Sequence, residues 1–215
     1  MTAGDFGSSL QARLELVGLS LEPRYVAPAE RYYQLLRRWN AATNLTSLPL
    51  DDFPARTLDR LFVEALQAAE LIDPSLLPSP LHCVDVGSGG GSPAIPLNIA
   101  RPALRLTMVE SVAKKAAFLR EAAREVGLEH ADVLTERIEH VAPGRIDNAD
   151  IVLLRGVRID RSLTEVLIRL LKPNGRILRF GPKAESVPEG FSAAERRPLA
   201  TGGELVVLEA ESRRL

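Results

Sequence analysis

The chain has 215 residues, of which 27 are Lys or Arg and 28 are Asp or Glu, so its formal net charge is −1. A hydrophobic content of 46% and a charged content of 26% are typical of a globular protein and exclude a disordered, collagen-like or fibrous chain. The balanced charge excludes a strongly basic nucleic-acid-binding coat, although it leaves room for a local basic face.

Residues 1–9 lack a basic segment followed by an apolar one, so we expect no signal peptide. No apolar run approaches the roughly 18 residues of a membrane span. The single cysteine, Cys83, cannot form an internal disulfide, which is typical of a cytoplasmic protein. The histidines His82, His130 and His140 have no metal-ligand spacing, so we interpret them and Cys83 as structural and expect no metal site.

Residues 8–72 have the pattern of helices. Apolar residues recur at helical spacing in three stretches, which are Leu10, Leu14 and Val17; Tyr32, Leu35, Leu36 and Trp39; and Leu58, Leu61, Phe62, Ala65, Leu66 and Ala69. Residues 44–54 have the composition of a loop, and residues 73–80 are broken by prolines. We therefore predict a helical extension over 1–72, a proline-rich linker over 73–80 and a main domain over 81–215.

The main domain alternates short apolar runs with amphipathic stretches. The runs are 81–86, 105–109, 131–134, 151–154 and 176–180, and the stretches include 112–126 and 161–171. This alternation predicts an α/β fold with a mostly parallel sheet. Residues 191–199 and 204–209, joined at Gly202-Gly203, predict a C-terminal antiparallel hairpin. Five parallel strands followed by a hairpin are the pattern of a Rossmann-like methyltransferase.

The most informative segment is the glycine-rich run that follows the first apolar strand of this domain. Gly87, Gly89 and Gly91 permit positive φ and the close approach of a ligand to the backbone. Pro93 then marks the first turn of a helix whose free N–H groups face the same point.

The spacing of the loop distinguishes between cofactors. Ser92 stands where a dinucleotide-binding loop has its third glycine. Asp85, just before the loop, would repel a pyrophosphate but suits the ammonium group of S-adenosylmethionine. Glu110, at the end of the second strand, is placed to accept hydrogen bonds from a ribose. The alternative is a glycine-rich turn with a solvated acid, which the combined strand, loop and helix context disfavours.

Two segments carry a family resemblance. Residues 85–97 have the form D-x-G-[ST]-G-x-G-x-P-x-[IL]-P-L, and residues 39–46 have the form W-N-x-x-x-N-L-T. Both resemble the bacterial 16S ribosomal RNA guanine-N7 methyltransferases, a family also called glucose-inhibited division protein B. The likeness covers roughly residues 30–210. It departs from the family at Ser92 and Ala94 in the loop and, on the expected substrate side, at Arg56 (usually His), Arg60 (usually Ser) and Phe180 (usually Lys).

The resemblance implies an S-adenosylmethionine-dependent enzyme that methylates 16S ribosomal RNA, free or in the small ribosomal subunit. We expect a monomer that does not bind membranes. The implied cofactor-binding residues are Asp85, Gly87, Gly89, Gly91, Pro93, Glu110 and Arg155, with Arg137, Ile138 and Glu139 on the adenine side. The candidates for catalysis are Arg155, Asn44 and Asp59.

Methyl transfer to guanine N7 requires no general base, because this nitrogen carries a lone pair and no proton. The sequence agrees, since the fourth strand ends in Arg155 rather than in an amide-methylating motif. Arg155, Arg158 and Arg161 are candidates to hold phosphates or a base, or are solvated at a helix start. Asn44 is equally consistent with a helix cap, and Asp59 with a solvated surface acid.

Three other functions remain open. A small-molecule methyltransferase of the same fold fits the departures at Arg56, Arg60 and Phe180 and the net charge. A non-catalytic RNA- or ribosome-binding protein would keep the fold without the activity. A nicotinamide-dependent dehydrogenase is disfavoured by Ser92 and Asp85.

Overall fold

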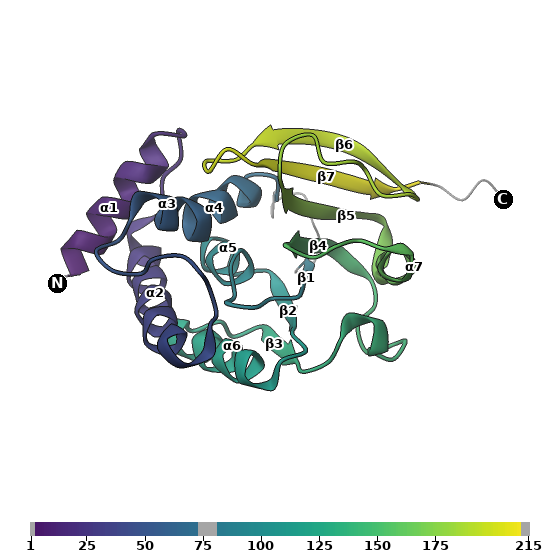
Figure 1. Cartoon of the computed structure of the whole chain (residues 1–215), viewed down its shortest axis with the longest axis horizontal. Coiled ribbons are helices and arrows are strands. Elements are labelled where there is room, and N and C mark those ends of the chain that lie inside the picture. Colours follow the sequence, from purple (N-terminus) through teal and green to yellow (C-terminus); the bar gives the residue numbers. More distant parts are fainter. Residues whose placement is uncertain (1–2, 73–80, 212–215) are drawn as a thin grey trace.

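The computed structural model describes residues 3–72 and 81–211 (Figure 1). The predicted linker at 73–80 lies outside the described residues, so the division into three segments stays a prediction. Within the described residues, no helix is long and apolar enough to cross a membrane.

The predicted helical extension is confirmed. Its elements are α1 (Ala3–Glu15), α2 (Pro23–Thr43), α3 (Ala55–Leu58), the π-helix η1 (Asp59–Val63) and α4 (Glu64–Ala69). Aromatic rings hold α1, α2 and η1 together: Phe6 lies 5.6 Å from Tyr33 and 5.5 Å from Phe62, measured between ring centroids. These rings are buried, and they belong to one hydrophobic core that the helical extension shares with the main domain.

The sheet has seven strands, which are β1 (His82–Val86), β2 (Arg105–Val109), β3 (Ala131–Leu134), β4 (Ala149–Arg155), β5 (Leu171–Gly181), β6 (Phe191–Pro198) and β7 (Glu204–Ala210). Their order is β3-β2-β1-β4-β5-β7-β6. The first five strands pair in parallel, whereas β7 is antiparallel to both β5 and β6. The predicted parallel sheet with a terminal hairpin is therefore confirmed.

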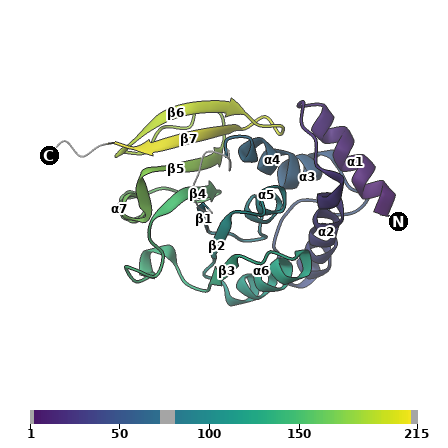
Figure 2. The same cartoon turned by 180° about the vertical axis from the view of Figure 1, so that it is seen from behind.

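Helices cover both faces of the sheet. They are α5 (Ala94–Ala100), α6 (Ala113–Val126) and α7 (Arg161–Leu170), with a 3₁₀ turn, η3 (Ile138–His140), after β3. Figures 1 and 2 show α5, α6 and the N-terminal helices on one side and α7 on the other. The alternation along β1 matches this arrangement, because Cys83 belongs to the core on the side of the N-terminal helices and Val84 to the core beneath α7.

The main local difference from prediction is the start of β5. The sequence pattern predicts a strand at 176–180 after the helical stretch 161–171, with a turn at Pro173-Asn174-Gly175 between them, but the strand begins at Leu171 and contains an irregularity opposite β4. The backbones lie so close here that a Cβ on Gly175 would sit 2.6 Å from the carbonyl oxygen of Ala149. Glycine thus lets the strand pair through a segment that local turn signals predict as a break.

Candidate functional site

The glycine loop lies at the carboxyl ends of the parallel strands, where ligands bind in folds of this kind. It follows β1 directly, and Val86 pairs with Val109 and Leu154 on the neighbouring strands. Gly91 has a φ of +87°, and a Cβ there would meet the Ile95 side chain at 2.6 Å, so no other residue fits without a shift. Gly89 also has positive φ, and a Cβ there would lie 3.8 Å from the Gly87 carbonyl oxygen, which is an ordinary contact distance. The protein therefore crowds the loop less at Gly89 than at Gly91.

Asp85 is buried at the base of this loop. Its Oδ2 atom has no hydrogen-bond partner among the described residues. Burial raises the pKa of this carboxyl to about 6, and nearby Arg155 acts in the opposite direction. A buried carboxylate with an unused oxygen suits a cationic ligand, because a partner there would offset its desolvation.

Glu110 closes the loop from the end of β2. One carboxylate oxygen accepts a hydrogen bond from the Gly89 N–H at 2.8 Å, and the other accepts one from the Val112 N–H at 2.8 Å. The residue is 7% exposed. Each oxygen retains a further lone pair, so Glu110 can hold the loop and still accept a hydroxyl group.

The predicted adenine-side segment lies at the end of β3, at the same edge of the sheet. Ile138 points into the core beneath α7, whereas Arg137 and Glu139 are exposed. The side chain of Ile138 is therefore part of the core, and a contact of this turn with adenine stays a prediction.

Two other candidates, Asn44 and Asp59, form contacts within the fold. Asn44 is exposed and ends α2 in the left-handed conformation, with a φ of 49°, so it is a C-terminal cap. Asp59 is buried and accepts two hydrogen bonds from Arg13, at 2.8 and 2.7 Å, which ties α1 to η1. The interpretation of Asp59 as a solvated surface acid is therefore wrong. Its partner Arg13 lies 46 residues away in the chain, so the local spacing around Asp59 could not indicate the contact.

A cavity of about 410 Å³ opens beside the glycine loop. Gly90 and Ser92 of the loop form one part of its wall, and Arg56, Arg60 and Arg155 contribute three guanidinium groups. This volume is in the range of small-ligand sites, roughly 300–1,000 Å³. The cavity thus combines a position next to the loop with a concentration of positive charge that the whole chain, at −1, does not have.

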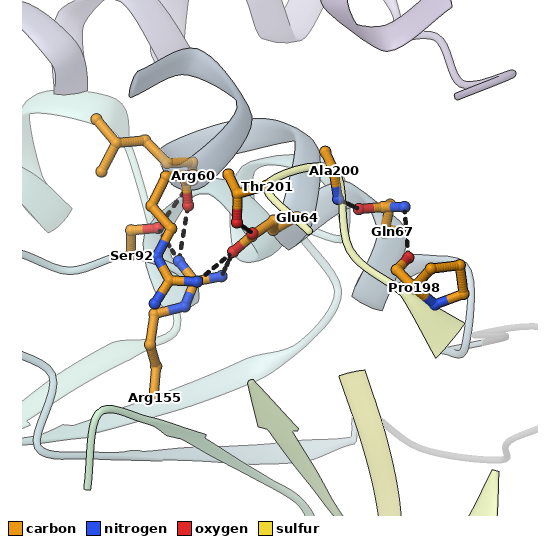
Figure 3. Close-up of polar contacts among 9 residues, drawn as sticks. Arg60, Glu64, Gln67, Ser92, Arg155, Pro198, Ala200 and Thr201 are labelled. Atoms are coloured by element: carbon orange, nitrogen blue, oxygen red, sulfur yellow. Dashed lines mark hydrogen bonds and ion pairs between the residues drawn. The ribbon is translucent and has the colours of Figure 1, made fainter. Parts of the chain in front are cut away.

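Arg155 is held in this wall by contacts to three elements (Figure 3). Its Nη2 donates to Glu64 at 2.7 Å, and its Nη1 donates to the Arg60 carbonyl at 2.7 Å and to the Ser92 hydroxyl at 3.1 Å. The guanidinium also stacks 4.3 Å from the ring centroid of Phe180. Burial lowers the pKa of Arg155 to about 10, so the group stays charged at neutral pH.

Glu64 is the centre of this arrangement and is fully buried. Its carboxylate accepts from Arg155, from Arg60 at 2.8 Å and from the Thr201 hydroxyl in the β6–β7 turn. One turn later, Gln67 donates to the Pro198 carbonyl and accepts from the Ala200 N–H (Figure 3). The segment η1–α4 therefore connects the glycine loop, the end of β4 and the C-terminal hairpin.

The sequence analysis did not identify Glu64, Thr201 or Tyr32 as site residues. Tyr32 donates from its hydroxyl to the Gly90 carbonyl at 2.6 Å, although its helical spacing indicated only a core position. A charged residue within the apolar stripe of 58–69 was the one available signal for Glu64.

Comparison with known proteins assigns the chain to a family. Residues 26–213 match the model of the GidB family, described as rRNA small subunit methyltransferase G. A protein of that name from Geobacillus thermodenitrificans is 35% identical over 204 residues, which are 94% of this chain and 82% of the relative. Another, from Stenotrophomonas maltophilia, is 35% identical over 91% of both chains.

Solved structures agree on the fold. Mitomycin 7-O-methyltransferase has a TM-score of 0.55 at 21% identity, over 88% of this chain and 69% of that one. TrmN from Thermus thermophilus has a TM-score of 0.54 at 21% identity, over 81% of this chain and 53% of that one.

Proposed function

Because the chain belongs to the GidB family of small-subunit ribosomal RNA methyltransferases, we propose that it transfers a methyl group from S-adenosylmethionine to N7 of a guanine in 16S ribosomal RNA. The observation that carries the proposal is the arginine-lined cavity directly beside the glycine loop. A methyl donor bound at the loop and a nucleotide bound in the cavity would be neighbours.

The donor would lie across the loop. Asp85 would pair with its ammonium group, Glu110 would accept from its ribose, and the backbone of 137–139 would border its adenine. Gly87, Gly89, Gly91 and Pro93 would shape the turn on which it rests. The unpartnered oxygen of Asp85 and the absence of a contact closer than 3.8 Å at a Cβ of Gly89 support this assignment. Bound there, S-adenosylmethionine supplies an electrophilic methyl group.

The protein's part in the reaction is orientation and exclusion of water. N7 attacks through its lone pair, so no side chain has to remove a proton. Arg155 forms the fixed wall that aligns the base, since its guanidinium is held by Glu64, Ser92 and the Phe180 ring. Asn44 and Asp59 would act indirectly, through the turn after α2 and the position of η1.

The test is methyl transfer to small ribosomal subunits and to naked 16S RNA from a strain that lacks the gene. We expect one newly methylated guanine, at N7, and tight S-adenosylmethionine binding by calorimetry. Tight cofactor binding with no transfer to any RNA preparation would contradict the RNA substrate. We place the reaction in the cytoplasm, where small subunits are assembled, and expect the enzyme to act as a monomer.

A small-molecule substrate is the second candidate, and one observation favours it. Arg56 and Arg60, where the resemblance expects His and Ser, both line the cavity. The dependence on salt concentration separates the two candidates. RNA binding releases counterions and therefore weakens steeply as the salt concentration rises, whereas binding of a small neutral substrate changes little.

A further inference from the structure

The three arginines of the cavity differ in what they already bind. Arg155 makes three hydrogen bonds within the protein, and its side chain is 10% exposed. Its Nε is buried and has no partner among the described residues. Arg155 therefore has little capacity left for a polyanion, and its charge is balanced by Glu64.

Arg60 and Arg56 have donors to spare. Arg60 has a side chain that is 33% exposed, and its one side-chain hydrogen bond within the described part of the chain goes from Nη1 to Glu64. Arg56 is exposed, and its side chain forms no hydrogen bond or ion pair with the residues at 3–72 and 81–211. Both line the cavity. A guanidinium has five N–H groups, so each retains a free fork suited to phosphate oxygens.

The balance of charges in the cavity's wall also indicates that Arg56 and Arg60 are available to an anionic ligand. Arg56, Arg60 and Arg155 contribute three positive charges, and the buried Glu64 contributes one negative charge, which leaves a surplus of two. Because Glu64 is fully buried and pairs with both Arg155 and Arg60, the surplus lies on the exposed Arg56 and on the donors of the partly buried Arg60 that Glu64 does not use.

We propose that Arg56 and Arg60 bind backbone phosphates of the RNA strand at the mouth of the cavity, while Arg155 remains bound to Glu64 and serves as a positioning residue for the base. This inference rests on the proposed function. It assigns two of the departures from the family pattern, Arg56 and Arg60, to substrate binding rather than to a change of reaction.

The experiment measures the affinity of labelled protein for small subunits from a deletion strain, by fluorescence anisotropy at 50, 100 and 200 mM salt. The variants are Arg56→Gln, Arg60→Gln and the double substitution. Each lost phosphate contact should reduce the slope of log K against log salt by about 0.7 to 0.9. The ratio of variant to wild-type dissociation constants should then fall about threefold per arginine between 50 and 200 mM.

Three controls separate phosphate binding from a change in the fold. Arg24→Gln removes an exposed arginine near the far end of α2, about 18 Å along the helix from Leu36 of the cavity wall, and should keep the wild-type slope. Arg56→Lys should also keep it, because the charge remains. S-adenosylmethionine affinity should stay within a few-fold of wild type in all of the variants.

The outcomes are distinguishable. If wild type binds and methylates subunits but the variants keep its slope, the phosphate assignment is overturned and the proposed function stands. If wild type neither binds nor methylates small subunits or naked 16S RNA, the proposed function fails and the inference fails with it. Loss of cofactor affinity in the arginine variants would overturn the separation of the two sites.

Discussion

At the scale of single residues, the buried carboxyl of Asp85, the proposed partner of the cofactor, lowers the free energy of unfolding at neutral pH. Its folded pKa of about 6 exceeds the unfolded value of about 3.9. Stability from this group is therefore full below pH ~3.9 and is lost as pH rises through ~6. The loss at neutral pH is on the order of 3 kcal/mol, at 1.36 kcal/mol per pKa unit.

Asp85→Asn should therefore stabilise the unliganded protein, by up to about 3 kcal/mol at pH 7.5 and roughly half of that at pH 5. The same substitution should weaken S-adenosylmethionine binding, since the ammonium group loses its partner. Urea denaturation and calorimetry at both pH values measure the two effects. A stabilisation that did not depend on pH would contradict the raised pKa.

The loop residues Gly89 and Glu110 give a second prediction at this scale. Gly89→Val should abolish cofactor binding, because its φ of +52° disfavours a branched residue and the side chain would occupy the ligand's space. Glu110→Ala should weaken binding by roughly 1–3 kcal/mol. Calorimetry is the measurement, with Gly127→Ala at the C-terminal end of α6 as a positive-φ control. Unchanged affinity in both loop variants would end the cofactor assignment.

At the scale of elements, the Glu64–Arg155 pair joins α4 to the end of β4. Removing one partner of a buried ion pair leaves an uncompensated charge, at a cost of about 3–5 kcal/mol. Glu64→Ala should therefore destabilise the protein by about that amount, and Arg155→Ala by less, because Glu64 retains Arg60 and Thr201. The double variant should be more stable than the sum of the two effects predicts.

The same variants test the positioning role of Arg155. Arg155→Ala should leave S-adenosylmethionine affinity within a few-fold but strongly reduce methyl transfer, and Lys should substitute poorly because it lacks the planar fork. Single-turnover transfer to small subunits below the unfolding temperature of each variant separates this effect from stability. Full transfer without Arg155 would assign the alignment of the base to another residue.

The contact between α1 and η1 is the other test at this scale. Asp59→Asn should destabilise the protein by about 1–3 kcal/mol, the usual effect of losing a charge-assisted hydrogen bond, and Arg13→Gln by a similar amount. Methyl transfer should fall equally in both variants if Asp59 acts through the position of η1. A much larger loss of transfer in Asp59→Asn than in Arg13→Gln would indicate a direct role for the carboxylate.

At the scale of the whole molecule, the features that could be predicted from the sequence are those that depend on residues close together in the chain. The strands, the glycine loop and the hairpin follow from local apolar patterns and turn residues, so their positions were predictable. Arg13 with Asp59 and Glu64 with Thr201 are separated by 46 and 137 residues. No local pattern encodes such pairs, which is why the cavity's wall was predicted only in part, from Arg56, Arg60 and Arg155.

The hydrogen bond between Glu64 and Thr201 also affects the order in which the site can form during synthesis of the chain. The N-terminal helices and β4 emerge from the ribosome long before the β6–β7 turn. Until that turn arrives, Glu64 lacks its third donor and Gln67 lacks both backbone partners. The last part of the cavity's wall is therefore synthesised well after the glycine loop, so a growing chain on the ribosome has the loop before it has the complete cavity.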